Sequence, residues 1–361
     1  MAAAFSAAQS PTASETPSVA APTIEAEAAP APTVDIALVL PLDTPAYARA
    51  ADAVRAGFLA AADAAGARAQ TRVFAHGEDG VLAAFQAARD AGAKVIVGPL
   101  VRDDVKVVAT MELDLPPTVA LNQLDEGVDA PPNLYTFALS IDSDARLIAR
   151  RIRSEAAQTV APGGAPGAPQ NVVVVSTETA LMKRFASAFA AEWMVAGGTV
   201  PGVYRFDATP GAMSALRREL AKKPPDAALL AMDSTGAALA KAYLGTVPSY
   251  ASGLVFERET LAATRDLDGL MLAEIPWIIN PGAPQFAALP KREFASAALT
   301  RLYALGLDAF RVAQAFRDGA PERFTLDGAT GQLTLEGRQF AREARLAVFR
   351  AGQLTPLDGS R

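Results

Sequence analysis

The stretch that decides the fold is residues 34–61, VDIALVLPLDTPAYARAADAVRAGFLAA. Its opening run, residues 34–40, is apolar and rich in β-branched and leucine side chains, which is typical of a buried strand. A turn at residues 41–45 follows, and the spacing of apolar residues predicts a helix over residues 46–65. The apolar stripe of that helix consists of Tyr47, Val54, Phe58 and Ala61.

The turn between this strand and helix contains good residues for starting a helix. Thr44 or Asp43 can accept hydrogen bonds from the first free N–H groups, and Pro45 suits the first turn. In an α/β sheet, loops after strands also line the ligand cleft. Asp43, Thr44 and Tyr47 are therefore candidate contacts for a ligand or partner, with helix capping as the alternative explanation for Asp43 and Thr44.

The same alternation of strand and helix continues along the chain and then starts again. Further strands are predicted at residues 72–75, 94–97, 117–121 and 134–139, and then at residues 171–175, 200–206 and 227–232. The helix stripe after residue 175 consists of Leu181, Phe185, Phe189 and Trp193. This repetition predicts an α/β fold of two doubly wound Rossmann-like lobes joined by crossovers around a cleft. Two tandem flavodoxin-like domains without a shared cleft are the alternative.

Composition divides the chain into four parts. Residues 1–33 are an Ala/Pro-rich tether, in which Ala, Pro, Ser and Thr occupy 25 of the 33 positions, and we expect it to be disordered. Residues 34–145 form the first predicted lobe and residues 146–280 the second. Residues 281–361 contain a long amphipathic helix and a hairpin, which we expect to pack back across the lobes.

The inventory of reactive side chains indicates a protein that is not an enzyme. The 361 residues include no cysteine and one histidine, His76, which excludes thiolate nucleophiles, disulfides and multi-histidine metal sites. Nucleophile-elbow, P-loop and dinucleotide-binding motifs are absent from the sequence. With 33 basic and 39 acidic residues and no basic run, a nucleic-acid partner is not expected. We expect no cofactor and no metal, and interpret His76 as an ordinary loop residue.

Several motifs in order resemble one family. In the first half they are ALVLPLDTPAYARAADAVRAGFLAA (37–61), VIVGPL (95–100) and TVALNQ (118–123). In the second half they are RFASAFAAEWMVAGG (184–198), EIPWII (274–279), RLYALGLDAF (301–310) and GATGQLTLEGR (328–338). From residue 34 onward the chain is similar to the penicillin-binding protein activator family, LpoA, also called LppC.

This resemblance implies a fold, a location and a partner. It implies the type I periplasmic-binding-protein fold, and an outer-membrane lipoprotein that stimulates peptidoglycan cross-linking by contacting a class A penicillin-binding protein. The long members carry an additional domain of helical repeats, so this chain is expected to be a short form. The family's lipid-bearing cysteine is missing, and we hypothesise that Met1 was placed after a removed signal and cysteine. A periplasmic binding protein for an amino acid or cell-wall metabolite is the alternative.

Other candidate contacts for a ligand or partner follow the predicted strands. They are Gly98, Pro99, Asn122 and Gln123 in the first lobe, and Thr177, Asp233, Ser234 and Trp277 in the second. Each also has a structural explanation. Gly98 and Pro99 can end a strand tightly, and Asn122 and Gln123 can fix a loop. The polar residues of the second lobe can cap a helix N-terminus, and Trp277 can pack in the core. Near the C-terminus, Arg338, Arg342 and Arg345 are interpreted as a basic helical face, which by default is solvated and alternatively binds an acidic partner.

Overall fold

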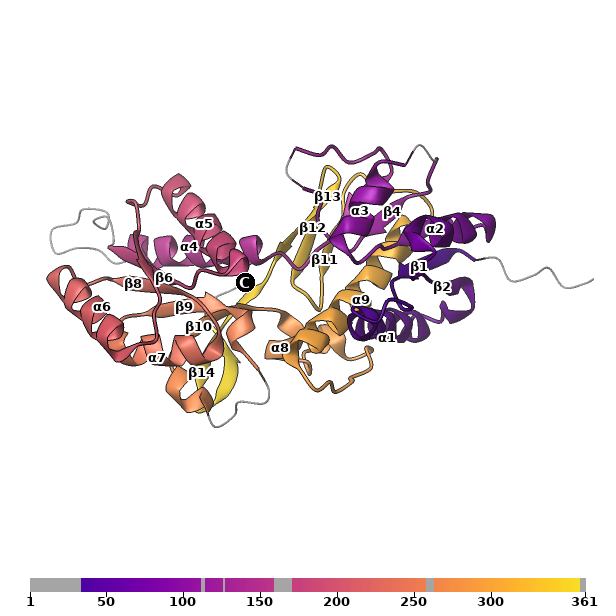
Figure 1. Ribbon diagram of the computed structural model, residues 1–361. Helices are drawn as coiled ribbons and strands as arrows, with labels where there is room; N and C mark the ends of the chain where they lie inside the picture. The colour runs from indigo at the N-terminus through magenta and orange to yellow at the C-terminus, as the bar shows by residue number, and fades with distance from the viewer. Residues whose placement is uncertain (1–33, 112–113, 126, 159–170, 258–262, 358–361) are drawn as a thin grey trace, which may run out of the picture. The chain divides into compact units, whose positions relative to one another are not determined.

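A computed structural model describes residues 34–111, 114–125, 127–158, 171–257 and 263–357. The first lobe contains a sheet in the order β2-β1-β3-β4-β5, followed by β13-β12-β11. Its parallel strands are β1 (Ile36–Leu40), β2 (Thr71–Ala75), β3 (Val95–Val97), β4 (Thr118–Ala120) and β5 (Leu134–Thr136). Its helices are α1 (Ala48–Ala64), α2 (Gly80–Asp90) and α3 (Arg102–Ala109) (Figure 1).

The second lobe repeats this unit. Its sheet runs β7-β6-β8-β9-β10, followed by β14-β15, so the first five strands have the same order as in the first lobe. These strands are β6 (Val172–Ser176), β7 (Gly202–Arg205), β8 (Ala227–Ala231), β9 (Ser249–Ser252) and β10 (Met271–Glu274). Its helices are α4 (Ile141–Gln158), α5 (Ala180–Val195), α6 (Pro210–Lys222) and α7 (Ser234–Leu244). The predicted repeat of a doubly wound unit is confirmed.

The C-terminal segment contributes to both lobes. After α8 (Pro276–Ile279), helix α9 (Ala297–Phe316) packs beside α1 in the first lobe. The strands after α9 are β11 (Thr325–Asp327), β12 (Gln332–Glu336), β13 (Gln339–Glu343), β14 (Arg345–Arg350) and β15 (Gln353–Pro356). Strands β11–β13 extend the first sheet, whereas β14 and β15 extend the second. The hairpins of these strands are antiparallel, so both sheets are mixed rather than wholly parallel.

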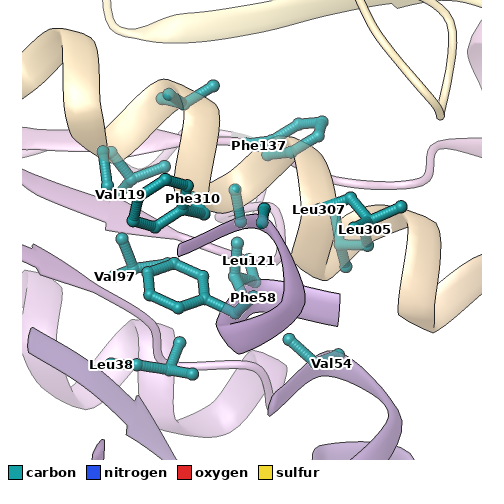
Figure 2. Packing of buried hydrophobic residues seen from close by; sticks show 14 of the residues in the cluster. Leu38, Val54, Phe58, Val97, Val119, Leu121, Phe137, Leu305, Leu307 and Phe310 are labelled. Atoms are coloured by element: carbon teal, nitrogen blue, oxygen red, sulfur yellow. The ribbon is translucent and has the colours of Figure 1, made fainter. Parts of the chain in front are cut away.

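One of the two core clusters of the first lobe lies between its sheet and the α1–α9 pair (Figure 2), and the other is formed with residues of α2 and α3. Phe58 and Phe310 are fully buried and meet edge to face, with ring centroids 5.4 Å apart. The two helix backbones touch because each has a glycine at the contact. A Cβ on Gly57 would lie 2.0 Å from the carbonyl oxygen of Tyr303, and one on Gly306 would lie 2.1 Å from that of Val54. A larger residue at either position would force the helices apart.

Two details of the predicted helices are wrong. Helix α1 starts at Ala48 because the N–H groups of Tyr47 and Ala48 both donate to the Thr44 carbonyl at 2.9 Å. Asp43 and Thr44 therefore belong to a turn, no side chain caps α1, and Tyr47 is exposed instead of joining the apolar stripe. In α5, Leu181 is likewise exposed and its neighbour Met182 is buried with the rest of the stripe.

Candidate functional site

The loops after β3 and β4 hold most of the first-lobe candidates, and their polar groups bond within those loops. The Asn122 side chain donates to the Leu100 carbonyl at 2.9 Å and accepts the Gln123 N–H at 2.9 Å. Gly98 has φ +113°, and a Cβ there would lie 2.1 Å from the Val39 carbonyl oxygen. The Pro99 carbonyl accepts the Leu121 N–H at 2.9 Å. These contacts give Asn122, Gly98 and Pro99 a structural role at the end of the sheet.

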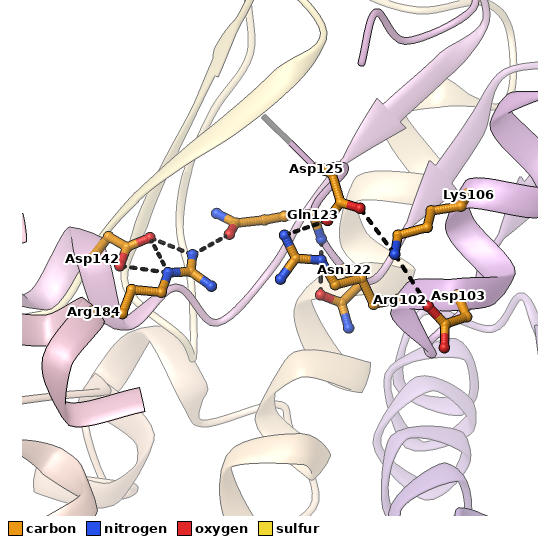
Figure 3. Close-up of polar contacts among 8 residues, drawn as sticks. All are labelled: Arg102, Asp103, Lys106, Asn122, Gln123, Asp125, Asp142 and Arg184. Atoms are coloured by element: carbon orange, nitrogen blue, oxygen red, sulfur yellow. Dashed lines mark hydrogen bonds and ion pairs between the residues drawn. The ribbon is translucent and has the colours of Figure 1, made fainter. Parts of the chain in front are cut away.

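Gln123 reaches across to the second lobe. Its Oε1 accepts a hydrogen bond from Arg184 Nη2 at 2.8 Å, while Arg184 Nε lies 2.9 Å from both carboxylate oxygens of Asp142 (Figure 3). Gln123 follows β4, whereas Arg184 lies on α5 and Asp142 on α4. This three-residue bridge ties the two lobes at the side where their parallel strands end.

A polar cavity of about 1020 Å³ surrounds this bridge. On the first-lobe side, Asp125 forms ion pairs with Arg102 at 2.7 Å and with Lys106 at 2.9 Å (Figure 3). The hydrogen bond from Lys106 lowers the pKa of the Asp125 carboxyl, and the charge of Arg102 adds to this effect. The lining thus contains the ion pairs Arg102–Asp125 and Arg184–Asp142, together with the further charged side chains Arg146, Arg338 and Glu336, which suits a polar surface more than a tight ligand pocket.

A second cavity, of about 440 Å³, lies where three helices begin. The N-cap side chains Thr179, Asp233 and Ser296, which start α5, α7 and α9, all line it. Asp233 Oδ1 accepts the Gly236 N–H at 2.8 Å, so the expected N-cap role of Asp233 is confirmed. Ser234 is the first residue of α7, and Thr177 lines the same cavity. The three helix N-termini contribute positive partial charges to this cavity, and the side chains of Asp233, Glu257 and Arg301 add charges of both signs.

A buried ion pair lies at one wall of that cavity. Arg301 on α9 binds Glu274 at the end of β10, with Nε 3.0 Å from Oε1, and also donates to the Gly253 carbonyl at 2.6 Å. The side chains are 12% and 1% exposed. Because both charges are desolvated, each depends on the other, and removal of one would leave a buried unpaired charge.

A family model described as "LppC putative lipoprotein" matches residues 8–212 and 213–352. The chain belongs to the LppC family. The Klebsiella pneumoniae protein named penicillin-binding protein activator LpoA is 30% identical over 286 residues, which is 67% of this chain and 38% of that protein. This LppC chain thus spans about two fifths of the length of the curated relatives it matches.

Solved structures resemble this LppC protein over most of its length. The LpoA C-domain of Haemophilus influenzae has a TM-score of 0.72 at 23% identity, covering 90% of this chain and 99% of that one. A Chromobacterium violaceum structure described as a "putative branched-chain amino acid ABC transporter" has a TM-score of 0.74 at 30% identity, covering 87% and 99%. The fold is therefore the predicted periplasmic-binding-protein-like α/β fold.

Trp277 is a core residue of this LppC protein and not a surface anchor. It is 3% exposed and packs against Phe286 and Tyr303, with ring centroids 5.3 and 6.1 Å away. It follows β10 as the other candidates follow their strands, but it lies on α8 and its ring packs against Tyr303 of α9. Core packing, the structural explanation for Trp277, is therefore confirmed, and Trp277 is no candidate for contact with a partner.

The predicted basic face of Arg338, Arg342 and Arg345 is also wrong, because these residues lie at β strands and not on a helix. The Arg342 side chain is 2% exposed and forms an ion pair with Asp144 on α4. Its two terminal nitrogens also donate to the Thr330 and Ser140 carbonyls at 3.0 and 3.1 Å. Burial raises the pKa of Asp144 to about 6, and the nearby Arg342 charge only partly offsets this.

Sequence patterns did not reveal the inter-lobe residues Arg184, Asp142 and Arg301. One signal was Glu274, a single charge in an otherwise apolar strand, which calls for a buried partner.

His76 is buried at the end of β2, with Nε2 3.8 Å from Asp104, and burial lowers its pKa. The described residues hold no group of three His, Asp or Glu side chains placed to bind a metal ion. None of the described helices has the length and apolarity needed to cross a membrane.

Proposed function

We propose that this LppC protein is a non-enzymatic activator of a class A penicillin-binding protein, acting in the periplasm through protein–protein contact. The observation that carries the proposal is the family match over residues 8–352, together with relatives named penicillin-binding protein activator LpoA. The H. influenzae LpoA C-domain is described as a regulator of PBP1A and shares this fold.

The side chains at the strand ends support action by binding rather than by catalysis. Asn122 bonds to its own loop, Asp233 caps a helix, and Asp142 is paired with Arg184. A protein that activates an enzyme by docking must bind the active state of that enzyme more tightly than the inactive state. A tenfold stimulation requires a difference in binding free energy of only about 1.4 kcal/mol.

The buried ion pairs fit this mechanism because they hold the docking surface in one shape. Arg301–Glu274 and Arg342–Asp144 each join elements of the two lobes. A surface fixed before binding loses little conformational entropy when the partner docks.

The test mixes the purified chain with a purified class A penicillin-binding protein and lipid II, and measures cross-linked muropeptides. We expect the transpeptidation rate to rise several-fold and to saturate as the chain reaches equimolar amounts. Heat-denatured chain is the control. An unchanged rate, with no complex detected by biolayer interferometry, would contradict the proposal.

A second candidate function rests on the 440 Å³ cavity. Its three helix N-termini suit a carboxylate, while apolar Met182, Met232 and Leu254 suit a short aliphatic side chain. The similarity to the "putative branched-chain amino acid ABC transporter" structure favours an amino acid. A rise in melting temperature with millimolar leucine or valine, lost in Asp233→Leu, would support this function.

A further inference from the structure

The outer edge of the second-lobe sheet has an open groove beside it. Strand β7 is the last strand of that sheet, with β6 as its one neighbour among the described residues. A cavity of about 470 Å³ lies between β7 and α5, lined by Ala186, Ser187 and Ala190 of the helix and by Val203 of the strand. The helix side chains are small, so α5 leaves the edge of the sheet uncovered.

The backbone of β7 has free hydrogen-bonding groups along this edge. The Phe206 N–H donates to the Ser176 carbonyl at 2.7 Å, and Ser176 is the register partner of Arg205. Alternate residues of a strand direct their N–H and C=O groups to opposite sides. The N–H and C=O groups of Val203 and Arg205 therefore point away from β6, toward the position that another strand would occupy.

Exposed apolar side chains gather at the same edge. Val203 is 68% exposed although its register partner Val174 is fully buried on the same face of the sheet. Val195, the last residue of α5, and Val200, in the segment that leads into β7, are 85% and 76% exposed. An unpaired edge with exposed valines is a template for pairing with another chain unless a partner covers it.

The charges at one end of the groove specify the occupant further. Lys183 pairs with Glu178 at 2.8 Å, and Arg205 is exposed beside the same carboxylate. The Lys183 hydrogen bond, with the charge of Arg205, lowers the pKa of Glu178. Two cations thus share one anion at this end, which leaves a positive charge for an acidic side chain of the partner.

We propose that the β7–α5 groove binds an extended peptide segment of a partner protein, which adds to the sheet as a strand beside β7. Main-chain hydrogen bonds to Val203 and Arg205 would hold it, with apolar side chains on Val203 and Ala190 and an acidic residue near Lys183 and Arg205. The inference rests on the proposed function only for the identity of the partner, a class A penicillin-binding protein.

The test uses one substitution in each lobe. Val203→Pro removes an N–H that points outward, so it blocks strand addition without removing a bond to β6. The matched control is Val73→Pro on β2. The His76 N–H donates to the Leu40 carbonyl of β1 at 3.0 Å, so the N–H groups of alternate residues, Phe74 and His76, face β1. The N–H of Val73 therefore points away from β1, as that of Val203 points away from β6. Ala190→Phe is a second groove variant that fills the space from α5 and leaves the edge backbone unchanged. Thermal unfolding checks that each variant is folded.

Two probes are measured with each variant: the purified class A penicillin-binding protein, and a fluorescein-labelled peptide that alternates valine with threonine and ends in two glutamates. We expect Kd for both probes to rise at least tenfold in Val203→Pro and Ala190→Phe, and less than twofold in Val73→Pro. No saturable binding of the peptide, or equal binding by folded Val203→Pro, would overturn the groove. A wild-type dimer that Val203→Pro makes monomeric would assign the edge to a second copy and overturn the proposed occupant.

The two proposals fail separately. If the penicillin-binding protein binds the wild type and Val203→Pro equally, the groove proposal falls and the proposed function stands. If the penicillin-binding protein binds neither, while the peptide binds as expected, the proposed function falls and the peptide groove stands.

Discussion

Strands β2 and β7 occupy the same place in the two lobes, yet the edge valine of β2 is half-buried and that of β7 is exposed. Each strand is the outermost of its sheet and pairs in parallel with the first strand of its lobe. Val73 of β2 is half-buried and packs on the cluster that also holds Leu59 of α1. Val203 of β7 faces the small residues of α5 and is 68% exposed.

The difference comes from the helix that connects the first two strands of each lobe. Helix α1 has Leu59 in its stripe and is held by α9, which the C-terminal segment adds to the first lobe. Helix α5 has Ala186 and Ala190 on the side toward β7, and α4 packs on it elsewhere. Strand β2 is further protected by Arg72, whose guanidinium lies 5.1 Å from the Phe74 ring centroid. The helix that follows the first strand thus covers the edge valine more fully in one copy of the repeated unit than in the other.

The largest effect on stability is expected from separating helices α1 and α9 in the first lobe. Gly57→Ala puts a methyl group 2.0 Å from the Tyr303 carbonyl oxygen and must separate α1 from α9. We expect a loss of about 3 kcal/mol or more in the free energy of unfolding, measured by urea denaturation. The control is Gly211→Ala on α6, where nothing lies within 4 Å and the change should be neutral or stabilising. Equal stability of the two variants would contradict the tight α1–α9 contact.

A smaller effect, dependent on pH, is expected where the two lobes join. Burial raises the pKa of Asp144 from 3.8 to about 6, so the folded protein binds a proton more tightly than the unfolded chain. The tighter proton binding by Asp144 adds at most about 3 kcal/mol to the free energy of unfolding. This stabilisation is fully present below pH 4 and is lost as the pH rises through 6. The stability of the wild type minus that of Asp144→Asn should therefore increase as the pH falls from 7.5 to 4. Urea unfolding across this range measures it, and a constant difference would refute the raised pKa.

The smallest effect compares the two edges directly. Val73→Thr places a hydroxyl in a half-buried position and should lower the free energy of unfolding by about 1 kcal/mol. Val203→Thr changes an exposed side chain and should alter it by less than about 0.5 kcal/mol. Parallel thermal melts of the two variants give the comparison. A larger loss in Val203→Thr would mean that the β7 edge is covered in solution.

The periodic part of the fold was readable from sequence, because buried strands and amphipathic helices carry local patterns. Strand β8 lies within its predicted range, residues 227–232, and the stripe residues Phe185, Phe189 and Trp193 are buried. The C-terminal arrangement was harder, because the placement of β13 beside β5 and of β14 beside β10 depends on contacts between distant residues.

The sequence predicted that the candidate residues lie at strand ends, but it did not predict which residues they contact. Asp233 lines a cavity at a strand end as expected, and Gln123 lines the cavity between the lobes. The partner of Gln123, Arg184, lies 61 residues away, and although it opens one of the family motifs, nothing in the sequence pairs it with Gln123. The exposed edge at Val203 could not be predicted for a different reason: an apolar strand has the same pattern whether a neighbour covers it or not.

The division of the last strands between the two sheets affects the order in which the protein can fold during synthesis. Strands β13 and β14 are separated by Ala344 alone, yet they belong to different lobes. Neither sheet can be completed until this segment has left the ribosome, although most of each lobe is synthesised much earlier. Completion of both sheets therefore requires the same C-terminal strands. A chain that ended before β11 would lack strands in both sheets, and neither lobe would be complete.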